Sequence, residues 1–313
     1  MIRRPPRSTL SSSSAASDVY KRQPDTTMTK PITFFLLLAC ACLAETPSDH
    51  ATLKASVAQI RHAPDGPVIV QQGDSKAHTR PYIHPLRSPD GKHVLTQFSP
   101  GHHKHQTGLY WGQTRINRRD FFHNYKGDYW KHIETRQGSN SMEFHSQLLD
   151  SKGDPILEDR QEWHYIPGEN HYILDLSWTG TAIQDVTIGR YAYGGLFLRM
   201  PWKRGIKASC INSEGHKNQQ GEGKPAKWVD LAMQIDGADS MAHVVMIDHP
   251  GNPGYPTLWR IDGQLGVGPA LARRGDIKIP AGESLTYRYR LLVYEGDDFR
   301  TKLVEQAMKS ISP

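Results

Sequence analysis

The sequence predicts an all-β protein, a large antiparallel β-sandwich of two sheets with one C-terminal helix. Apolar residues recur at every second position in short runs, which is the period of a half-buried strand. Gly, Pro, Asn and Asp separate these runs, and no β-α-β alternation appears along the 313 residues. Two sheets packed face to face are the simplest way to bury so many antiparallel strands.

The alternation is clearest in the segments 172–178 and 285–293, where an apolar residue occupies every second position. Each segment therefore presents one apolar face and one mostly polar face, as a strand that covers a core does. Further strands are expected at 67–71, 81–86, 93–98, 107–114, 142–149, 156–166, 184–191, 195–200, 226–235, 242–248 and 257–261. We expect these strands to form a single domain over residues 67–296.

One helix is expected at 297–313, where Asp297 is placed to cap the first turn. Its apolar residues recur at helical spacing and form one stripe: Phe299, Leu303, Val304, Ala307, Met308 and Ile311. The segments 115–140 and 212–225 are long, polar and rich in His, Asn, Gln, Gly and Lys, so they are expected as loops. Residues 45–66 carry no clear pattern.

The N-terminal residues form no part of this domain. Residues 1–27 have no hydrophobic period and are interpreted as a sequencing or assembly artefact, with a disordered leader as the alternative. Residues 28–44 have a short basic start, an apolar run and a small-residue end, which together indicate a secretory signal peptide. The protein is therefore expected to be exported, as a periplasmic or extracellular protein, with a lipid anchor on Cys40 as an open alternative.

Charge and cysteine content exclude several classes of protein. The formal net charge is +6, but residues 1–27 hold five basic and two acidic side chains, so the rest of the chain carries only +3. Such a balance gives no reason to expect a nucleic-acid partner. Cys210 is the single cysteine beyond residue 44, which argues against a disulfide framework. No apolar run beyond residue 44 is long enough for a membrane span, so the rest of the chain is not expected to be an integral membrane protein. No transmembrane partner is implied.

The densest group of chemically active residues is the run 101–108, Gly-His-His-Lys-His-Gln-Thr-Gly. On an extended backbone His103 and His105 point the same way. The pair therefore either binds one divalent metal ion as the cofactor, or contacts a substrate as acid and base without a metal, or belongs to a solvated turn.

Two further groups follow strands. Asp248, His249 and Asn252 lie in a Pro- and Gly-rich turn, where they either cap the turn or face a ligand. Glu214 and His216 lie two residues apart in a polar loop. A carboxylate beside an imidazole is the smallest set of groups for acid–base catalysis, and the alternative is an exposed loop whose Glu is simply solvated.

Arginine and aromatic side chains complete the candidate site. Arg80 is a candidate anchor for a substrate hydroxyl or anion. Trp111 and Trp228 are candidates for stacking on sugar rings, although sandwich cores use tryptophan equally. Loops at one end of a sandwich gather residues that are distant in sequence, so His103, His105, Glu214 and His249 are expected to share a pocket as catalytic groups.

Several of these motifs occur in an order that resembles a secreted bacterial family labelled methane oxygenase PmoA-like, over about residues 67–296. The matching stretches are Arg80-Pro-Tyr-Ile-His-Pro-Leu86, Ser88-Pro-Asp-Gly91, His102-His-Lys-His-Gln-Thr-Gly-Leu-Tyr-Trp-Gly112, Tyr193-Gly-Gly-Leu196, Ala226-Lys-Trp-Val-Asp-Leu231, Asp248-His-Pro-Gly-Asn-Pro253 and Gly282-Glu-Ser-Leu-Thr-Tyr-Arg-Tyr289. The sequence departs from the family's commoner His-His-Arg pattern, with Lys104-His105-Gln106 instead. No methane monooxygenase activity is implied, because the chain lacks the spanning segments that such a subunit needs.

The resemblance implies a β-supersandwich like that of galactose mutarotases, whose sites use paired His and a Glu around a sugar. The leading hypothesis is therefore a carbohydrate-active enzyme with His and Glu acid–base chemistry, acting on a carbohydrate or glycoside as an epimerase, lyase or hydrolase. The alternatives are a non-catalytic glycan-binding module and a structural protein of the envelope.

Overall fold

The computed structural model describes residues 51–52, 57–62, 66–72, 78–101, 103–235 and 240–311. The chain divides into two units, Met1–Thr46 and Pro47–Pro313, and all described residues belong to the second. The expected leader and signal peptide therefore lie outside the described residues. Within the described part, no helix has the length and apolar character to cross a membrane.

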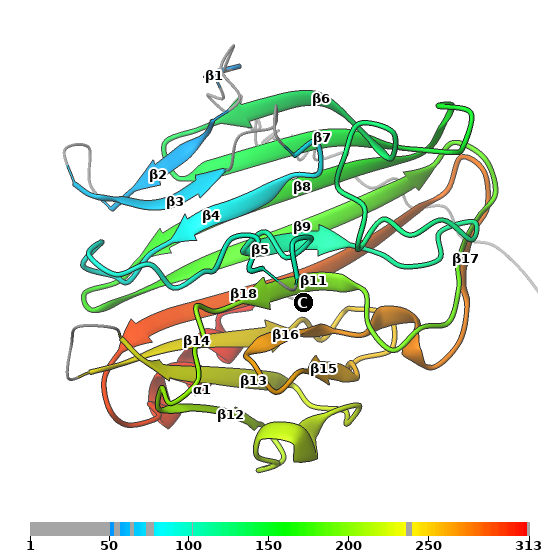
Figure 1. Ribbon diagram of the computed structural model, residues 1–313. Helices are drawn as coiled ribbons and strands as arrows, with labels where there is room; N and C mark the ends of the chain where they lie inside the picture. The colour runs from blue at the N-terminus through cyan, green and yellow to red at the C-terminus, as the bar shows by residue number, and fades with distance from the viewer. Residues whose placement is uncertain are drawn as a thin grey trace, which may run out of the picture. The chain divides into compact units, whose positions relative to one another are not determined.

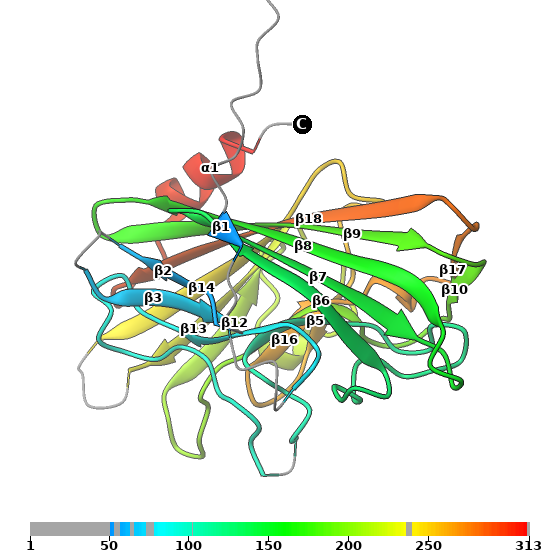
Figure 2. The same cartoon turned by 90° about the horizontal axis from the view of Figure 1, so that it is seen from above.

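Two large antiparallel sheets form the body of the second unit, so the predicted β-sandwich is confirmed (Figures 1 and 2). The nine-stranded sheet has the order β1 (Ala51–Thr52), β6 (Trp130–Gln137), β7 (Ser141–Leu149), β8 (Pro155–Pro167), β9 (His171–Ala182), β18 (Ser284–Glu295), β14 (Met241–Asp248), β13 (Trp228–Gln234) and β12 (Ala208–Asn212). The seven-stranded sheet has the order β15 (Trp259–Ile261), β16 (Gly266–Pro269), β11 (Gly195–Arg199), β5 (Leu109–Gly112), β4 (Tyr82–Leu86), β3 (Val68–Gln72) and β2 (Gln59–Arg61).

Smaller elements connect or flank these sheets. β10 (Val186–Ile188) and β17 (Ile277–Ile279) form a two-stranded antiparallel sheet. Two short 3₁₀ turns span Asn218–Gly221 and Leu271–Arg273.

The core lies between the two large sheets, because their facing side chains join one buried cluster. Trp111 of β5 stacks on Trp178 of β9, with ring centroids 4.3 Å apart and planes at 15°. The register of β9 against β18 places Trp178 beside Tyr287. The two segments with the clearest alternation, 172–178 and 285–293, therefore lie side by side and form the sheet face that packs against Trp111. Alternate side chains of a strand point to one face, which is why the period-two pattern finds the core.

The C-terminal helix α1 (Thr301–Lys309) covers the outer face of the nine-stranded sheet, as Figure 2 shows. The helix begins later than the expected 297, and its N-cap is Arg300 rather than Asp297. Its predicted stripe packs on a second apolar cluster that includes Val245, Ile247 and Leu292. The expected helix is therefore confirmed in kind and shorter in extent.

Two expectations about local structure are wrong, and a third needs one short turn added. The segment 93–98 forms only isolated bridges, at Val94 and Phe98. The expected loop 115–140 ends in the strand β6, which hydrogen-bonds to β7. The loop 212–225 contains the 3₁₀ turn Asn218–Gly221.

Candidate functional site

Arg80 holds together two loops that extend from the seven-stranded sheet. Its side chain is fully buried, and its guanidinium donates hydrogen bonds to the backbone oxygens of Phe122 and His105 and to Thr107 Oγ1. It also lies 3.8 Å from the centroid of the Tyr110 ring. Burial lowers the pKa of Arg80 to about 10, so the group stays charged at neutral pH. The predicted role as a substrate anchor is corrected: Arg80 positions the loops from inside.

These loops bring three imidazoles together. The ring centroids of His103 and His105 are 5.7 Å apart, and those of His105 and His123 are 4.4 Å apart. Burial, followed by the nearby charges of His123, Arg80 and His103, lowers the pKa of His105 to about 3. His105 is therefore a neutral imidazole at physiological pH, able to donate one hydrogen bond and accept another.

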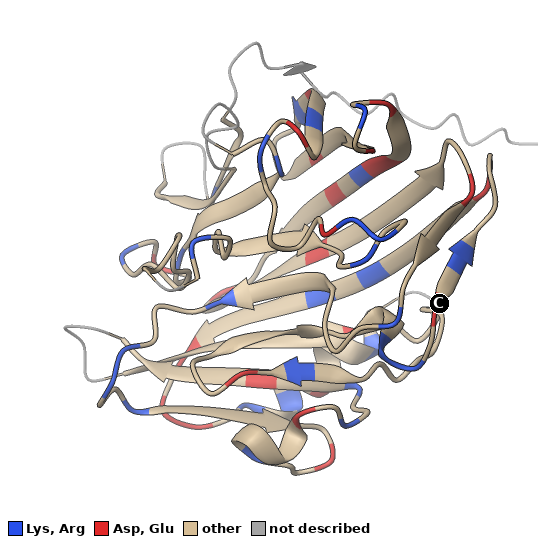
Figure 3. Cartoon of the chain, turned by 45° about the vertical axis from the view of Figure 1, so that its right-hand side comes forward, with Lys and Arg blue, Asp and Glu red and all other residues tan. Residues whose placement is uncertain are grey.

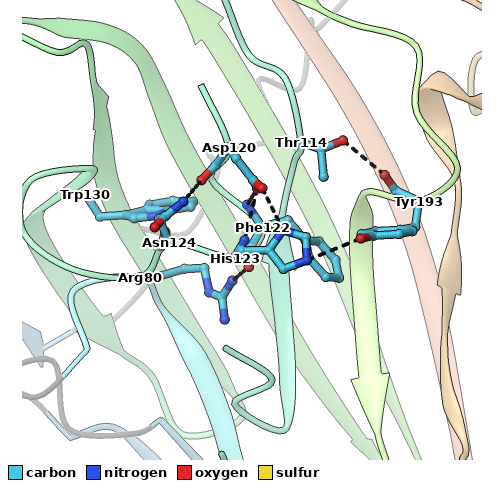
Figure 4. A network of polar contacts seen from close by, with 8 residues as sticks. All are labelled: Arg80, Thr114, Asp120, Phe122, His123, Asn124, Trp130 and Tyr193. Carbon is cyan, nitrogen blue, oxygen red and sulfur yellow. Dashed lines mark hydrogen bonds and ion pairs between the residues drawn. The ribbon is translucent and has the colours of Figure 1, made fainter. Parts of the chain in front are cut away.

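A hydrogen-bond chain runs through His123 (Figure 4). Its Nδ1 lies 2.6 Å from Asp120 Oδ2, and its Nε2 lies 3.2 Å from the Tyr193 hydroxyl. Burial acts to raise the pKa of Asp120, but hydrogen bonds from the His123 ring, the His123 amide and the Phe122 amide outweigh it and lower the pKa. In the tautomer with its proton on Nδ1, His123 donates to the Asp120 carboxylate, and its Nε2 accepts from the Tyr193 hydroxyl.

A cavity of about 80 Å³ opens between these groups, lined by His103, His105, Gln106, Phe122, His123, Tyr193, Phe197, Arg260 and Asp262. Arg260 and Asp262 come from the end of β15, on the opposite edge of the seven-stranded sheet from β2. Burial raises the pKa of Tyr193, and its contact with Tyr191 raises it further, so the phenol stays protonated. The cavity thus combines the protonated phenol of Tyr193, the neutral imidazole of His105, the guanidinium of Arg260 and the carboxylate of Asp262.

His249 and its neighbours lie elsewhere. His249 lines a different cavity of about 380 Å³, and its Nδ1 accepts a hydrogen bond from Gly251 N at 2.9 Å. Asp248 is buried, and its carboxylate accepts from Asn252 Nδ2 at 2.8 Å and Thr257 N at 2.7 Å. Burial raises the pKa of Asp248 to about 6. Asp248 and Asn252 therefore cap their own turn, the alternative considered for them beside ligand binding.

The Glu214 loop also lies outside the histidine cavity. Glu214 is exposed and accepts a hydrogen bond from Ser213 Oγ, while Asn212 Oδ1 holds the amides of Glu214 and His216. Glu214 lines neither the histidine cavity nor that of His249. We expected His103, His105, Glu214 and His249 to share one pocket, and this is wrong: of the four, only His103 and His105 line the histidine cavity.

The two tryptophans proposed to stack on sugars are used in packing. Trp111 is 1% exposed in the core. Trp228 stacks on Phe299, with ring centroids 5.0 Å apart, beside the C-terminal helix. Both indoles are therefore used in packing, Trp111 within the core and Trp228 against Phe299.

Metal-ligating side chains were expected at His103 and His105. Among the described residues, the group whose ligand atoms all lie within 4.8 Å of one another is instead Asp90, His93 and Glu295. Asp90 Oδ1 already accepts from Ser88 Oγ and the Lys92 amide, and its Oδ2 lies 3.1 Å from Lys92 Nζ. Because the turn itself uses these oxygens, this group carries no metal assignment, and the metal at His103 and His105 stays a prediction.

Sequence reasoning missed Asp120 and seven of the nine lining residues, which are Gln106, Phe122, His123, Tyr193, Phe197, Arg260 and Asp262. Tyr193 lies in one of the quoted motifs, and His123 lies in a loop noted for its polar composition. These residues meet at one cavity only through contacts between loops that are distant in sequence, such as that between His123 and Tyr193, 70 residues apart. Local spacing in the sequence does not predict such contacts.

The strand order and shared core define the protein as a two-sheet antiparallel β-sandwich with a histidine-lined cavity between loops of its smaller sheet. The chain belongs to a family of unknown function (DUF6807), whose family model matches residues 62–309. The PmoA-like name stays a prediction. A search of curated proteins gave no match.

Three solved structures are similar to the chain at low sequence identity. A galactose mutarotase related enzyme from Lactobacillus acidophilus is 8% identical, with a TM-score of 0.34 and coverage of 80% of this chain and 98% of that chain. A candidate aldose 1-epimerase from Escherichia coli K12 is 10% identical, with a TM-score of 0.36 and coverage of 78% and 98%. A candidate kojibiose phosphorylase from the human microbiome is 8% identical at a TM-score of 0.34; the match covers 58% of this chain but only 22% of the phosphorylase. The expected likeness to galactose mutarotases appears here, at TM-scores that carry no further argument.

Proposed function

We propose that the protein is a carbohydrate-active enzyme that transfers protons in the cavity of His105, His123 and Tyr193. The observation that carries the proposal is the hydrogen-bond chain from Asp120 through His123 to the Tyr193 hydroxyl, which ends at that cavity. An imidazole oriented by a carboxylate and facing a hydroxyl is an arrangement suited to general acid–base catalysis.

Each group has a role that follows from its protonation. A substrate hydroxyl at the Tyr193 oxygen loses its proton to that oxygen as the phenolic proton passes to His123 Nε2. Asp120 then stabilises the imidazolium through Nδ1. His105, as a neutral ring, donates a hydrogen bond to a second substrate oxygen where negative charge develops.

The lining supports a sugar as the substrate class. Arg260 and Asp262 place a guanidinium and a carboxylate at the cavity, where the hydroxyl groups of a sugar can hydrogen-bond to them. Glycoside hydrolysis commonly uses two carboxylates on either side of the scissile bond. Asp262 is the single carboxylate among the lining residues, and it already accepts from Arg199, so epimerisation or elimination fits this cavity better than hydrolysis.

The proposal also includes export. The apolar segment at 28–44 supports a signal peptide, and a periplasmic or extracellular location would suit an enzyme that acts on environmental carbohydrate. The lipid anchor on Cys40 remains an open alternative.

Proton transfer is tested by incubating the protein in D₂O with a panel of aldoses and uronic acids and following ring interconversion, exchange and elimination by NMR. We expect turnover by the wild type, reduced about 100-fold in Tyr193→Phe and His123→Ala, the range typical of a lost acid–base group. His216→Ala, in a loop outside the cavity, is the matched control and should leave the rate unchanged. Saturable sugar binding without turnover by the wild type would overturn the enzyme proposal in favour of the glycan-binding module.

A further inference from the structure

A larger cavity of about 690 Å³ lies beside the loop that carries His123. It is lined by Arg115, Asn117, Arg118, Thr187, Gly189 and Asp276. Its walls come from the segment after β5 and from the small sheet of β10 and β17. No role suggested by the sequence or the proposed acid–base chemistry uses these residues.

The arginine-bearing loop is held in a fixed and strained form. Arg115, Asn117 and Arg118 have φ angles of 57°, 46° and 69°, in the left-handed region that residues other than glycine rarely adopt. The Asn117 side chain donates to Asp185 O at 3.0 Å and accepts from Thr187 N at 2.8 Å. Hydrogen bonds to the neighbouring strand therefore maintain a backbone that would otherwise relax, and they keep both arginines at the cavity.

Among the described residues, neither Arg115 nor Arg118 forms an ion pair. Arg118 makes no hydrogen bond, ion pair or ring contact with any described residue. Arg115 donates to the Arg190 backbone oxygen at 3.1 Å and lies 4.6 Å from the centroid of the Tyr191 ring, without an acidic partner. Asp276 is the single acid of the lining, and it accepts from the Arg190 amide. The lining therefore carries one net positive charge, and a free guanidinium fork suits a carboxylate or a sulfate.

Two tyrosines connect the arginine-bearing loop to the histidine cavity. The Tyr191 ring, on which Arg115 lies, is 4.8 Å from the Tyr193 ring, whose hydroxyl contacts His123. Thr114, the residue before Arg115, donates to the Tyr193 backbone oxygen at 3.3 Å (Figure 4). The same two chain segments thus supply one wall to each cavity.

We propose that the arginine-lined cavity binds an anionic group, a carboxylate or a sulfate ester, of the carbohydrate whose reacting part enters the histidine cavity. The inference rests on the proposed function and adds the substrate class, an acidic rather than a neutral saccharide.

The test uses matched probes that differ only in charge. Isothermal titration compares trigalacturonate with its full methyl ester, and galactose 6-sulfate with galactose, so the two arms separate a carboxylate from a sulfate ligand. We expect at least one anionic probe to bind at least tenfold more tightly than its neutral partner, and Arg118→Ala to remove about tenfold of that affinity, the effect of one charged hydrogen bond. The affinity should also fall with added salt, since the guanidinium is exposed. Arg204→Ala, which removes an exposed arginine outside the cavity, should bind as the wild type does.

Equal affinity for charged and neutral probes, absence of binding by both anionic probes at millimolar concentration, or unchanged affinity in Arg118→Ala would overturn the inference. His123→Ala separates this result from the proposed function. If His123→Ala loses turnover while Arg118→Ala binds the anionic probe as the wild type does, the anion site is refuted and the acid–base site is not. The reverse pattern, in which His123→Ala keeps turnover while Arg118→Ala loses the anionic probe, refutes the acid–base site and supports the anion site.

Discussion

The imidazole of His105 differs from an exposed histidine because of what surrounds it. It is partly buried, and the ring of His123, the guanidinium of Arg80 and the ring of His103 all disfavour a second positive charge there. A ring with so low a pKa is a poor base, so among the roles left open by the sequence the structure favours for His105 a contact with substrate in which the ring donates a hydrogen bond.

This shifted pKa makes stability depend on pH. The pKa of His105 is about 3 in the folded protein, against about 6.5 in an unfolded chain, so the unfolded chain binds the proton first. The stability that depends on neutral His105 is present above pH 6.5 and is lost as the pH falls towards 3. We expect His105→Gln to lose less thermal stability than the wild type between pH 7 and pH 4.5. His164→Gln, at an exposed position, serves as the control, and equal pH dependence in His105→Gln and wild type would show that His105 is not buried as described.

Single residues also show how far the sequence predicts the site. His103 and His105 line one cavity, as expected, but they lie in a hydrogen-bonded turn and not on the extended backbone from which their shared direction was expected. Glu214 and His249 follow strands just as His103 does, yet their loops fold back on Asn212 and Gly251. The choice between these outcomes depends on long-range contacts such as those of Arg80, and no local pattern contains them.

Among the elements, those with strong alternation were predictable and the short or polar ones were not. β16 reads Gly-Val-Gly-Pro, which is typical of a turn, and it is a strand because it pairs with β11 and β15. β6 has a mixed burial pattern and pairs with β7 through a bulge. Because its sequence is mostly polar and lacks a regular alternation, the sequence predicted a loop there. Pairing with a neighbour overrides weak local preference in such strands.

The C-terminal helix was predictable because its apolar stripe has helical spacing. Val304 is 2% exposed and packs on the outer face of the nine-stranded sheet. Val304→Ala removes two buried methyl groups and should lower the free energy of unfolding by roughly 2 kcal/mol. Lys302→Ala, on the exposed side of the same helix, should leave it unchanged, as chemical denaturation would show. An equal effect of both substitutions would mean that the helix does not pack as described.

For the whole molecule, the two sheets share one core and are expected to unfold together. Trp111→Ala would remove the stack between β5 and β9 and should cost roughly 3–5 kcal/mol. Because both sheets contribute to this cluster, we expect the midpoints from far-UV circular dichroism and from fluorescence to fall together in the variant. Two separate transitions would indicate that the sheets are independently stable.

Charge is distributed without a dominant sign: Lys and Arg are interspersed with Asp and Glu along the strands and loops (Figure 3). Long-range attraction of a ligand is therefore weak, and recognition depends on local groups at the two cavities. The groups proposed for recognition and proton transfer lie on the loops on both sides of β5, before β11 and at the end of β15.

The most direct test of this account is the steady-state turnover of Asp120→Asn. An amide at position 120 keeps the size of the side chain but presents an N–H, which favours the His123 tautomer with its proton on Nε2 and blocks acceptance from Tyr193. We predict that kcat falls at least about 100-fold while KM and the unfolding temperature stay close to those of the wild type. Unchanged kcat, or a loss of activity fully explained by unfolding, would contradict the claim that the Asp120–His123–Tyr193 chain transfers the proton.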